Sequence, residues 1–167
     1  MDPEFKDIGT EEFDFEDTQW SKHPVYAEWD KEKKLEFIRD LNAWSTSQFL
    51  HGEQGALLVA SQLASCAPTF NAKLYAASQT FDEARHVEAF NKYLQTRLKR
   101  TWPIGTALKG LLDKILTDPR WDLKFIGMQI VIEGLALAAF NAAKNATNDP
   151  VYEQMLDYII RDEARHV

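Results

Sequence analysis

The stretch Asp82-Glu83-Ala84-Arg85-His86-Val87 recurs letter for letter as Asp162-Glu163-Ala164-Arg165-His166-Val167. The offset is 162 − 82 = 80 residues, and a six-residue coincidence in a chain of 167 residues is not expected by chance. The same offset links Glu53 with Glu133, because 133 − 53 is also 80. Each half of the chain therefore carries a single Glu and, 30 residues later, the start of a Glu-x-x-His motif.

Helix-breaking residues near the middle of each half predict two antiparallel helical hairpins. Pro68 lies midway between the Glu and the Glu-x-x-His of the first half, and Asn148-Asp149-Pro150 spans the midpoint of the second. Residues equidistant from a turn lie at the same height in a hairpin, so each lone Glu faces its own motif about 22 Å from the turn. Within a motif, the Glu and the His share one helix face because they are three residues apart.

Composition predicts helix for nearly all of the chain from Asp30 onward. The segments between prolines are rich in Ala, Leu, Glu, Lys and Gln, and none alternates like a strand. The fold class is therefore all-α. The expected helices are a short one near 31–40, continuous or not with a long one ending near residue 66, then 69–99, 104–117, 120–146 and one starting near 150.

The segment of about 20 residues from 101 to 119 separates the two hairpins and contains an amphipathic stretch, 108–116. Helices that alternate up and down need only short loops, so this length predicts a crossover connector. We expect a four-helix bundle of two antiparallel hairpins joined by this connector over residues 29–167. An irregular acidic arm, residues 1–28, is expected to lie on it.

Packing the hairpins together brings four carboxylates and two imidazoles to one level of the bundle. Apolar residues flank the acids at helical spacing, which places the acids on core-facing stripes. Four buried carboxylates without counter-charge would cost several kcal/mol each, whereas two divalent cations would neutralise them. Oxygen and imidazole donors without thiolates suit iron or manganese, in a pattern known from dinuclear bundle sites. The predicted metal ligands are Glu53, Glu83, His86, Glu133, Glu163 and His166.

The remaining polar residues of the repeat have an expected supporting role. A metal-bound histidine usually donates its second ring N–H to a carboxylate, a carbonyl or water. We therefore predict that Asp82 supports His166 and that Asp162 supports His86 across the bundle. Arg85 and Arg165 would balance these aspartates. The alternative is that the four residues form ordinary surface pairs three positions apart.

An apolar lining is expected around the centre, where it would exclude water. The alternative for these side chains is plain bundle core. Tyr75 is the tyrosine expected near the inner face of the first hairpin. The expected lining residues are Phe49, Leu57, Phe81, Phe90, Ile130, Leu137, Phe140 and Ile159.

This arrangement resembles the ferritin-like superfamily, specifically the di-iron oxidase and oxygenase branch related to the ribonucleotide reductase small subunit. The resemblance covers about residues 40–167 and implies a dinuclear iron centre whose ferrous form reacts with O₂. It implies that Glu83 and Glu163 are bridging, catalytic carboxylates. It further implies that Glu53 with His86 completes one iron site and that Glu133 with His166 completes the other.

Several positions differ from that branch. Phe90 stands where reductase small subunits usually carry a radical-forming tyrosine, and Glu53 stands where they commonly have Asp, which disfavours such a subunit. Ile159 occupies the position of an extra histidine ligand in arylamine N-oxygenases. The chain ends one residue after His166, whereas members of the branch continue. We therefore expect either a fragment, truncated at the C-terminus, or support of the site by a neighbouring subunit.

The implied activity is that of a non-haem di-iron oxidase or oxygenase that activates O₂ and oxidises a small, largely apolar organic substrate. Two iron ions are the expected cofactors, with manganese or a mixed manganese–iron pair as alternatives. An external electron donor and a homodimer are also expected. Two other functions stay open: a ferroxidase or iron-storage protein, and a non-catalytic metal-binding fragment.

Composition excludes several other classes. Acidic residues outnumber basic ones 26 to 19, and a formal charge of −7 does not attract phosphate backbones, so no nucleic-acid partner is expected. A single cysteine excludes a disulfide framework and fits a reducing, cytoplasmic location. The longest apolar stretch, 125–140, is broken by Gln129 and Glu133, so no membrane span is expected.

Overall fold

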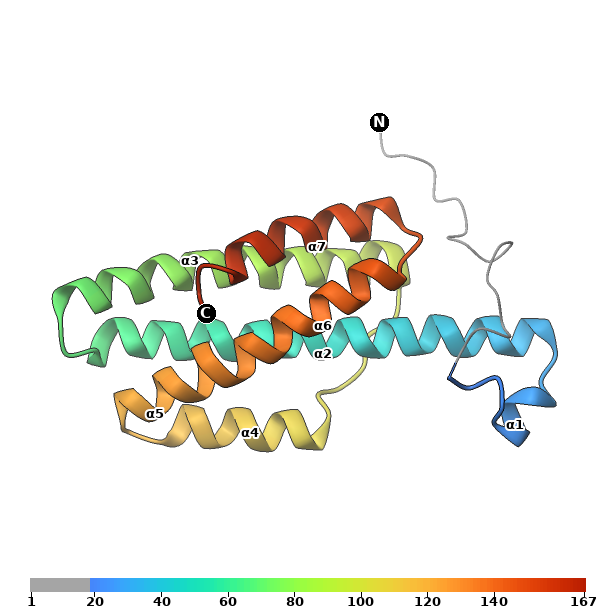
Figure 1. The fold of residues 1–167 in the computed structure, drawn as a ribbon, viewed down its shortest axis with the longest axis horizontal. Helices are drawn as coiled ribbons and strands as arrows, with labels where there is room; N and C mark the ends of the chain where they lie inside the picture. Colours follow the sequence, from blue (N-terminus) through green and yellow to red (C-terminus); the bar gives the residue numbers. More distant parts are fainter. Residues whose placement is uncertain (1–18) are drawn as a thin grey trace.

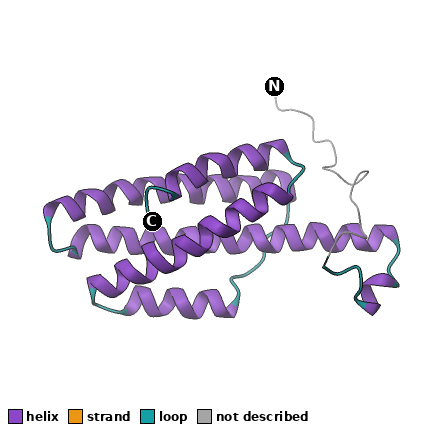
Figure 2. Cartoon of the chain, in the orientation of Figure 1, coloured by secondary structure: helices purple, strands orange, loops and turns teal. Residues whose placement is uncertain are grey.

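The computed structural model describes residues 19–167, and residues 1–18 lie outside the described part. Every regular element among the described residues is helical (Figure 2), which confirms the all-α prediction. The elements are α1 (Pro24–Ala27), α2 (Lys31–Cys66), α3 (Phe70–Tyr93), α4 (Thr106–Thr117), α5 (Trp121–Phe125), α6 (Glu133–Ala146) and α7 (Pro150–Glu163). Two π-helical segments, η1 (Leu94–Leu98) and η2 (Ile126–Ile132), extend α3 and join α5 to α6.

Local capping explains where the long helices begin. The side chain of Asp30 accepts a hydrogen bond from the backbone N–H of Lys33 and starts α2, which runs unbroken for 36 residues. Thr69 caps α3 in the same way. Asp149 caps α7, whose first residue is Pro150. The residues between 31 and 66 thus form one helix, not two.

The helices pack as two antiparallel pairs with a shorter helix beside them (Figure 1). α2 packs against α3 and α6 against α7, while α3 also contacts α7. α4, the helix of the connector, lies against α2. On α2, Leu50 belongs to one apolar cluster and Ala56 to another, with Glu53 between them. The level of Glu53 is therefore a polar layer between two apolar cores.

The π-helical segment η2 changes which side chains face inward ahead of Glu133. A π-helix pairs residues five apart, so each turn holds more residues than an α-turn. In this segment Met128 and Gln129 are buried, whereas Ile126 and Ile130 are 53% and 56% exposed. The expectation that Ile130 lines the site is therefore wrong. The same expectation is wrong for Phe81 on α3, which is 66% exposed.

By length and composition alone, the continuous helical segment 121–146 is apolar enough to cross a membrane, with a mean hydropathy of 1.7 in its most apolar window. One-third of that window, 33%, is buried in the fold. The segment carries Gln129 and Glu133 on its buried side. Core helices of soluble proteins satisfy the same criteria, so the segment is weak support for a membrane span.

The described part of the N-terminal arm packs on the start of α2. The rings of Trp20, Tyr26 and Trp29 lie 5.5–5.8 Å from the ring of Phe37. The arm includes the one-turn helix α1, so residues 19–28 are not wholly irregular. The rest of the predicted arm, residues 1–18, lies outside the described residues.

Candidate metal centre

Four helices bring the six predicted ligands together in the polar layer. α2 supplies Glu53, α3 supplies the first Glu-x-x-His, and α6 begins at Glu133. α7 ends at Glu163, and His166 follows in the turn after it. All six side chains are buried, with at most 5% of any residue exposed. Donor atoms within 4.8 Å of one another form two groups: Glu53, Glu83, His86 and Glu163, and Glu83, Glu133, Glu163 and His166.

The two groups share Glu83 and Glu163, and each has one histidine directed into it. Nδ1 of His86 lies 3.0 Å from Glu163 Oε1 and 3.4 Å from Glu83 Oε2. Nδ1 of His166 lies 3.1 Å from Glu83 Oε1 and 3.4 Å from Glu163 Oε2. In each ring, therefore, Nδ1 is the nitrogen available to a cation at the centre.

The other ring nitrogen of each histidine faces an aspartate from the opposite repeat. Nε2 of His86 lies 3.3 Å from Asp162 Oδ2, and Nε2 of His166 lies 3.5 Å from Asp82 Oδ2. These are the cross-bundle neighbours that the sequence assigns to the two aspartates. The His86 contact is a hydrogen bond, whereas Nε2 of His166 has no hydrogen-bond partner. A carboxylate that accepts from Nε2 fixes the tautomer that leaves Nδ1 free for a metal.

Each arginine of the repeat pairs with both aspartates. Arg85 lies 2.5 Å from Asp82 and 2.9 Å from Asp162, and Arg165 lies 2.5 Å from Asp162 and 3.8 Å from Asp82. The two sequence interpretations, pairing within a helix and pairing across the bundle, thus occur together. Both guanidinium groups are at least half exposed, so water screens much of their charge.

Sequence reasoning missed a buried amide pair, Gln79 and Gln129. The Gln79 amide donates to Glu133 Oε1 and, at 3.3 Å, to Glu83 Oε1. Its oxygen accepts a hydrogen bond of 2.8 Å from Gln129 Nε2. Each glutamine is 1% exposed. The signal that could have found them is their spacing, because each precedes a predicted ligand Glu by four residues and so lies on the same helix face.

Tyr75 anchors the turn that carries His166. Its hydroxyl donates to the backbone carbonyl oxygens of His166, at 2.8 Å, and of Arg165, at 3.3 Å. Burial, together with the negative charges of nearby glutamates, raises the pKa of Tyr75 to about 12. The hydroxyl therefore stays protonated and remains a donor at neutral pH, which ties the end of the chain to α3.

The carboxylates of the centre are in an environment that disfavours negative charge. Burial, reinforced by repulsion from Glu83 and Glu163, raises the pKa of Glu133 to about 8. Burial also raises the pKa of Glu53 well above its ordinary value. Burial acts in the same direction on Glu83, but the close imidazoles of His166 and His86 outweigh it and hold the pKa of Glu83 below its usual range.

The histidines take up protons because the carboxylates surround them. Burial alone would lower the pKa of each ring, yet the close carboxylates of Glu163 and its neighbours raise the pKa of His86 to about 12 and that of His166 to about 10. Two imidazolium ions thus supply positive charge among four carboxyl groups. Protons here fill the electrostatic role that a metal cation would fill.

The pattern of unpartnered atoms fits a cation at the centre. Buried atoms that lack a hydrogen-bond partner include Glu83 Oε2, Glu133 Oε2, Glu163 Oε1 and Nδ1 of His166. Leaving a buried polar atom unpaired costs about 1–3 kcal/mol. The four atoms named here belong to Glu and His side chains, which ligate divalent cations once deprotonated. The donor set therefore suits one or two bound cations.

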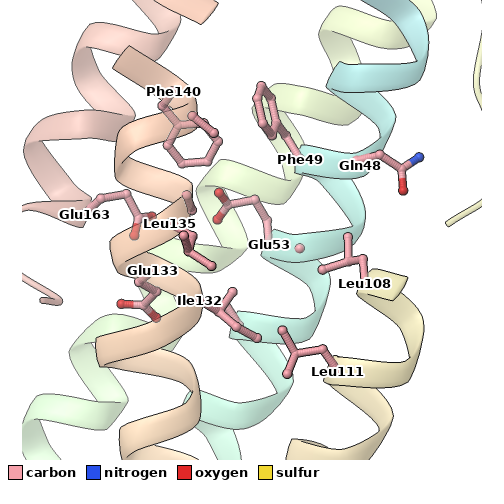
Figure 3. A pocket seen from close by; sticks show the side chains of 14 residues that line it. Gln48, Phe49, Glu53, Leu108, Leu111, Ile132, Glu133, Leu135, Phe140 and Glu163 are labelled. Atoms are coloured by element: carbon pink, nitrogen blue, oxygen red, sulfur yellow. The ribbon is translucent and has the colours of Figure 1, made fainter. Parts of the chain in front are cut away.

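An apolar cavity of about 240 Å³ opens beside the carboxylates (Figure 3). It lies between α2 and α6, with α4 along its outer side. Glu53, Glu133 and Glu163 form its polar wall. Of the eight expected lining residues, Phe49 and Phe140 line this cavity, and the other six are absent from its walls.

Comparison with protein-family models, with curated proteins and with solved structures finds no match for this chain. The interpretation of the centre therefore depends on its own residues, their spacing and their geometry.

Proposed function

We propose that the chain is a ferritin-like non-haem di-iron oxidase or oxygenase, built as a four-helix bundle of two hairpins with a crossover connector. One observation carries the proposal: two overlapping groups of buried donors share Glu83 and Glu163. Two cations in such a pair of groups would each have an imidazole and three carboxylates within reach. The sharing of two carboxylates is what a dinuclear centre requires and a single-ion site does not.

The residues divide naturally between two ions. Glu53 and His86 belong to one donor group alone, and Glu133 and His166 belong to the other alone. Iron is the proposed metal, with manganese or a mixed pair as alternatives, because the donors are oxygen and imidazole. When bound, ferrous iron would supply electrons for the reduction of O₂, and an external donor would restore them.

The chain's own residues bind, orient and exclude water. Asp162 is hydrogen-bonded to Nε2 of His86, Asp82 lies 3.5 Å from Nε2 of His166, and Gln79 donates to the carboxylates of Glu133 and Glu83. Glu83 and Glu163, which belong to both donor groups, would be within reach of both ions. Apolar walls on the cavity side exclude water from the carboxylates, which strengthens electrostatic interactions there.

The apolar cavity favours an organic substrate over ferrous iron as the molecule that is oxidised. A path for Fe²⁺ would need carboxylates or other polar groups along its length, whereas the walls of this cavity beyond the glutamates are mostly Leu, Ala and Phe. The same feature favours an enzyme over a non-catalytic metal-binding fragment. A homodimer in the cytoplasm completes the proposal.

Metal analysis tests the proposal directly. The full chain is loaded anaerobically with ferrous iron, and iron content is measured before an optical spectrum is recorded on exposure to O₂. We expect two irons per chain, lost in Glu83→Ala and in Glu163→Ala. Glu88→Ala is the matched control, because Glu88 is an exposed residue on the same helix as Glu83.

Unchanged iron content in Glu83→Ala and Glu163→Ala would overturn the proposal, as would fewer than two irons in the wild-type chain. Light scattering separates the alternative function. A large closed shell that stores iron would replace the oxygenase proposal with iron handling.

A further inference from the structure

Gly52 is placed where a helix normally carries a side chain. It lies in the interior of α2, where glycine costs about 1 kcal/mol relative to alanine. A Cβ atom added to Gly52 would meet no heavy atom within 4 Å, and Gly52 lines the cavity. Gly55, three residues on, differs because its added Cβ would lie 2.5 Å from Leu112. Close packing against Leu112 explains the glycine at position 55, whereas the glycine at position 52 leaves open space in the cavity.

Small residues on facing helices create the rest of that space. Ala56 of α2 and Ala136 and Ala139 of α6 also line the cavity. Phe49 and Phe140 close one end with their rings edge to face, 4.9 Å between centroids (Figure 3). Two leucines of α4, Leu108 and Leu111, lie along the outer side.

The inner wall offers acceptors and no positive charge. Glu133 Oε2 and Glu163 Oε1 are buried without hydrogen-bond partners, and both residues line the cavity. Among the described residues that line it there is no Lys, Arg or His. The amide of Gln48, the lining residue that is polar but not acidic, donates a hydrogen bond to the carbonyl of Pro103 and accepts one from the N–H of Gly105. Nothing in the walls can balance an anionic ligand.

We propose that this cavity binds an uncharged, apolar molecule larger than benzene beside the carboxylate centre, and that Gly52 sets the size it admits. An apolar cavity of about 150 Å³ accommodates benzene, and this one measures about 240 Å³. An acid of the same size is rejected, because its charge would enter a site walled by hydrocarbon and carboxylates. The assignment of this molecule as the substrate rests on the proposed function, but its binding does not require metal.

Calorimetric titration of the full chain with two probes tests the ligand class. Ethylbenzene is neutral, and phenylacetate has a similar skeleton with a negative charge. With a chelator present, so that no metal can capture the acid, we expect saturable binding of ethylbenzene and at least tenfold weaker binding of phenylacetate. Absence of saturable ethylbenzene binding, or equal affinity for the two probes, overturns the proposal.

Gly52→Leu tests the size-setting role. The substitution fills the cavity while removing an unfavourable helix glycine, so we expect at least tenfold weaker ethylbenzene binding in a chain that is still folded. Gly110→Leu is the matched control, since Gly110 lies within α4, outside the cavity walls, and its added Cβ also meets nothing. Ala139→Leu fills the cavity from the facing helix and is expected to act like Gly52→Leu.

If both filling variants bind ethylbenzene as the wild type does, the cavity is not the binding site. Iron content, measured on chelator-free portions of the same preparations after anaerobic loading with ferrous iron, keeps the two proposals separate. Two irons per chain without ethylbenzene binding overturns the cavity assignment alone. Ethylbenzene binding without iron overturns the proposed oxidase and leaves the cavity as a binding site for apolar molecules.

Discussion

Gln79→Leu is the most informative single substitution outside the predicted ligands. The Gln79 amide is 1% exposed, donates to Glu133 and Glu83, and accepts from Gln129. Leucine has nearly the same volume, so the change removes hydrogen bonds without leaving a cavity. Ile159, the residue 80 positions later, shows that an apolar side chain is compatible with the equivalent position in the second half.

The hydrogen-bond inventory sets the expected magnitude. Gln129 Oε1 already lacks a partner, so losing Gln79 leaves the whole amide of Gln129 buried and unpaired, at a cost of about 1–3 kcal/mol. Glu133 loses its one side-chain donor, a further ~1 kcal/mol. Apolar burial by the new leucine offsets about 1 kcal/mol. We expect a net loss of ~2 kcal/mol in unfolding free energy, or a melting temperature lower by about 4–8 °C.

Urea unfolding of the metal-free chain at pH 7 measures this loss. Replacing both amides in Gln79→Leu/Gln129→Leu should recover at least ~1 kcal/mol, because two apolar partners leave no unpaired amide. Gln95→Leu, at an exposed position, should stay within ~0.5 kcal/mol of the wild type. A single variant as stable as the wild type, or strictly additive losses in the double variant, would refute this account of the amide pair.

Three further predictions concern pH, the C-terminal turn and the aspartates. The pKa values of Glu133, His86 and His166 are raised to about 8, 12 and 10 in the fold, so the native metal-free chain binds more protons than the unfolded chain. Its urea midpoint should therefore be lower at pH 9 than at pH 6. An equal or higher midpoint at pH 9 would contradict these pKa shifts. Tyr75→Phe should cost ~1 kcal/mol and speed the loss of bound iron to a chelator, whereas Tyr158→Phe, at an exposed position, should change neither. Asp162→Asn should weaken metal binding about 10–100-fold; unchanged affinity in an equilibrium metal titration would show that Asp162 gives His86 no support.

The repeat predicts which residues come together because their pairing in a hairpin depends only on where the hairpin turns. Pro68 and Asn148-Asp149-Pro150 fix where each hairpin turns, and a turn fixes which residues lie at equal height. The structure has these turns between α2 and α3 and between α6 and α7, and it brings the six donors together. Whether these residues bind iron stays a prediction, because spacing constrains position more tightly than it constrains the bound ion.

The inner lining could not be predicted in the same way, because it depends on helical phase. In an ideal α-helix both Ile130 and Gln129, three and four residues before Glu133, would share its face. In the π-helical segment η2, Gln129 stays buried and Ile130 turns to solvent. Hydrophobic periodicity favours isoleucine over glutamine at a buried position, so it predicts the wrong buried residue in this π-helical segment, which contributes to a polar site. The cavity could not be predicted from the sequence for a related reason. Gly52 contributes space and has no side chain, so it adds nothing to the hydrophobic periodicity.

The two halves of the chain differ at positions around the carboxylates, and those differences make the centre asymmetric. The residues four positions before the predicted ligand glutamates are Phe49, Gln79, Gln129 and Ile159. Gln129 donates to Gln79, which donates to Glu133, whereas Ile159 belongs to an apolar cluster against which Phe49 packs. At the next repeat pair, Gly52 opens the cavity while its counterpart Ile132 lines it. An exact duplication would give two equivalent ion positions. The positions at which the two halves differ make one side of the centre polar and hydrogen-bonded and leave the other side apolar. Under the proposed function, the repeated residues account for the metals, and the residues that break the repeat determine which molecule reaches them.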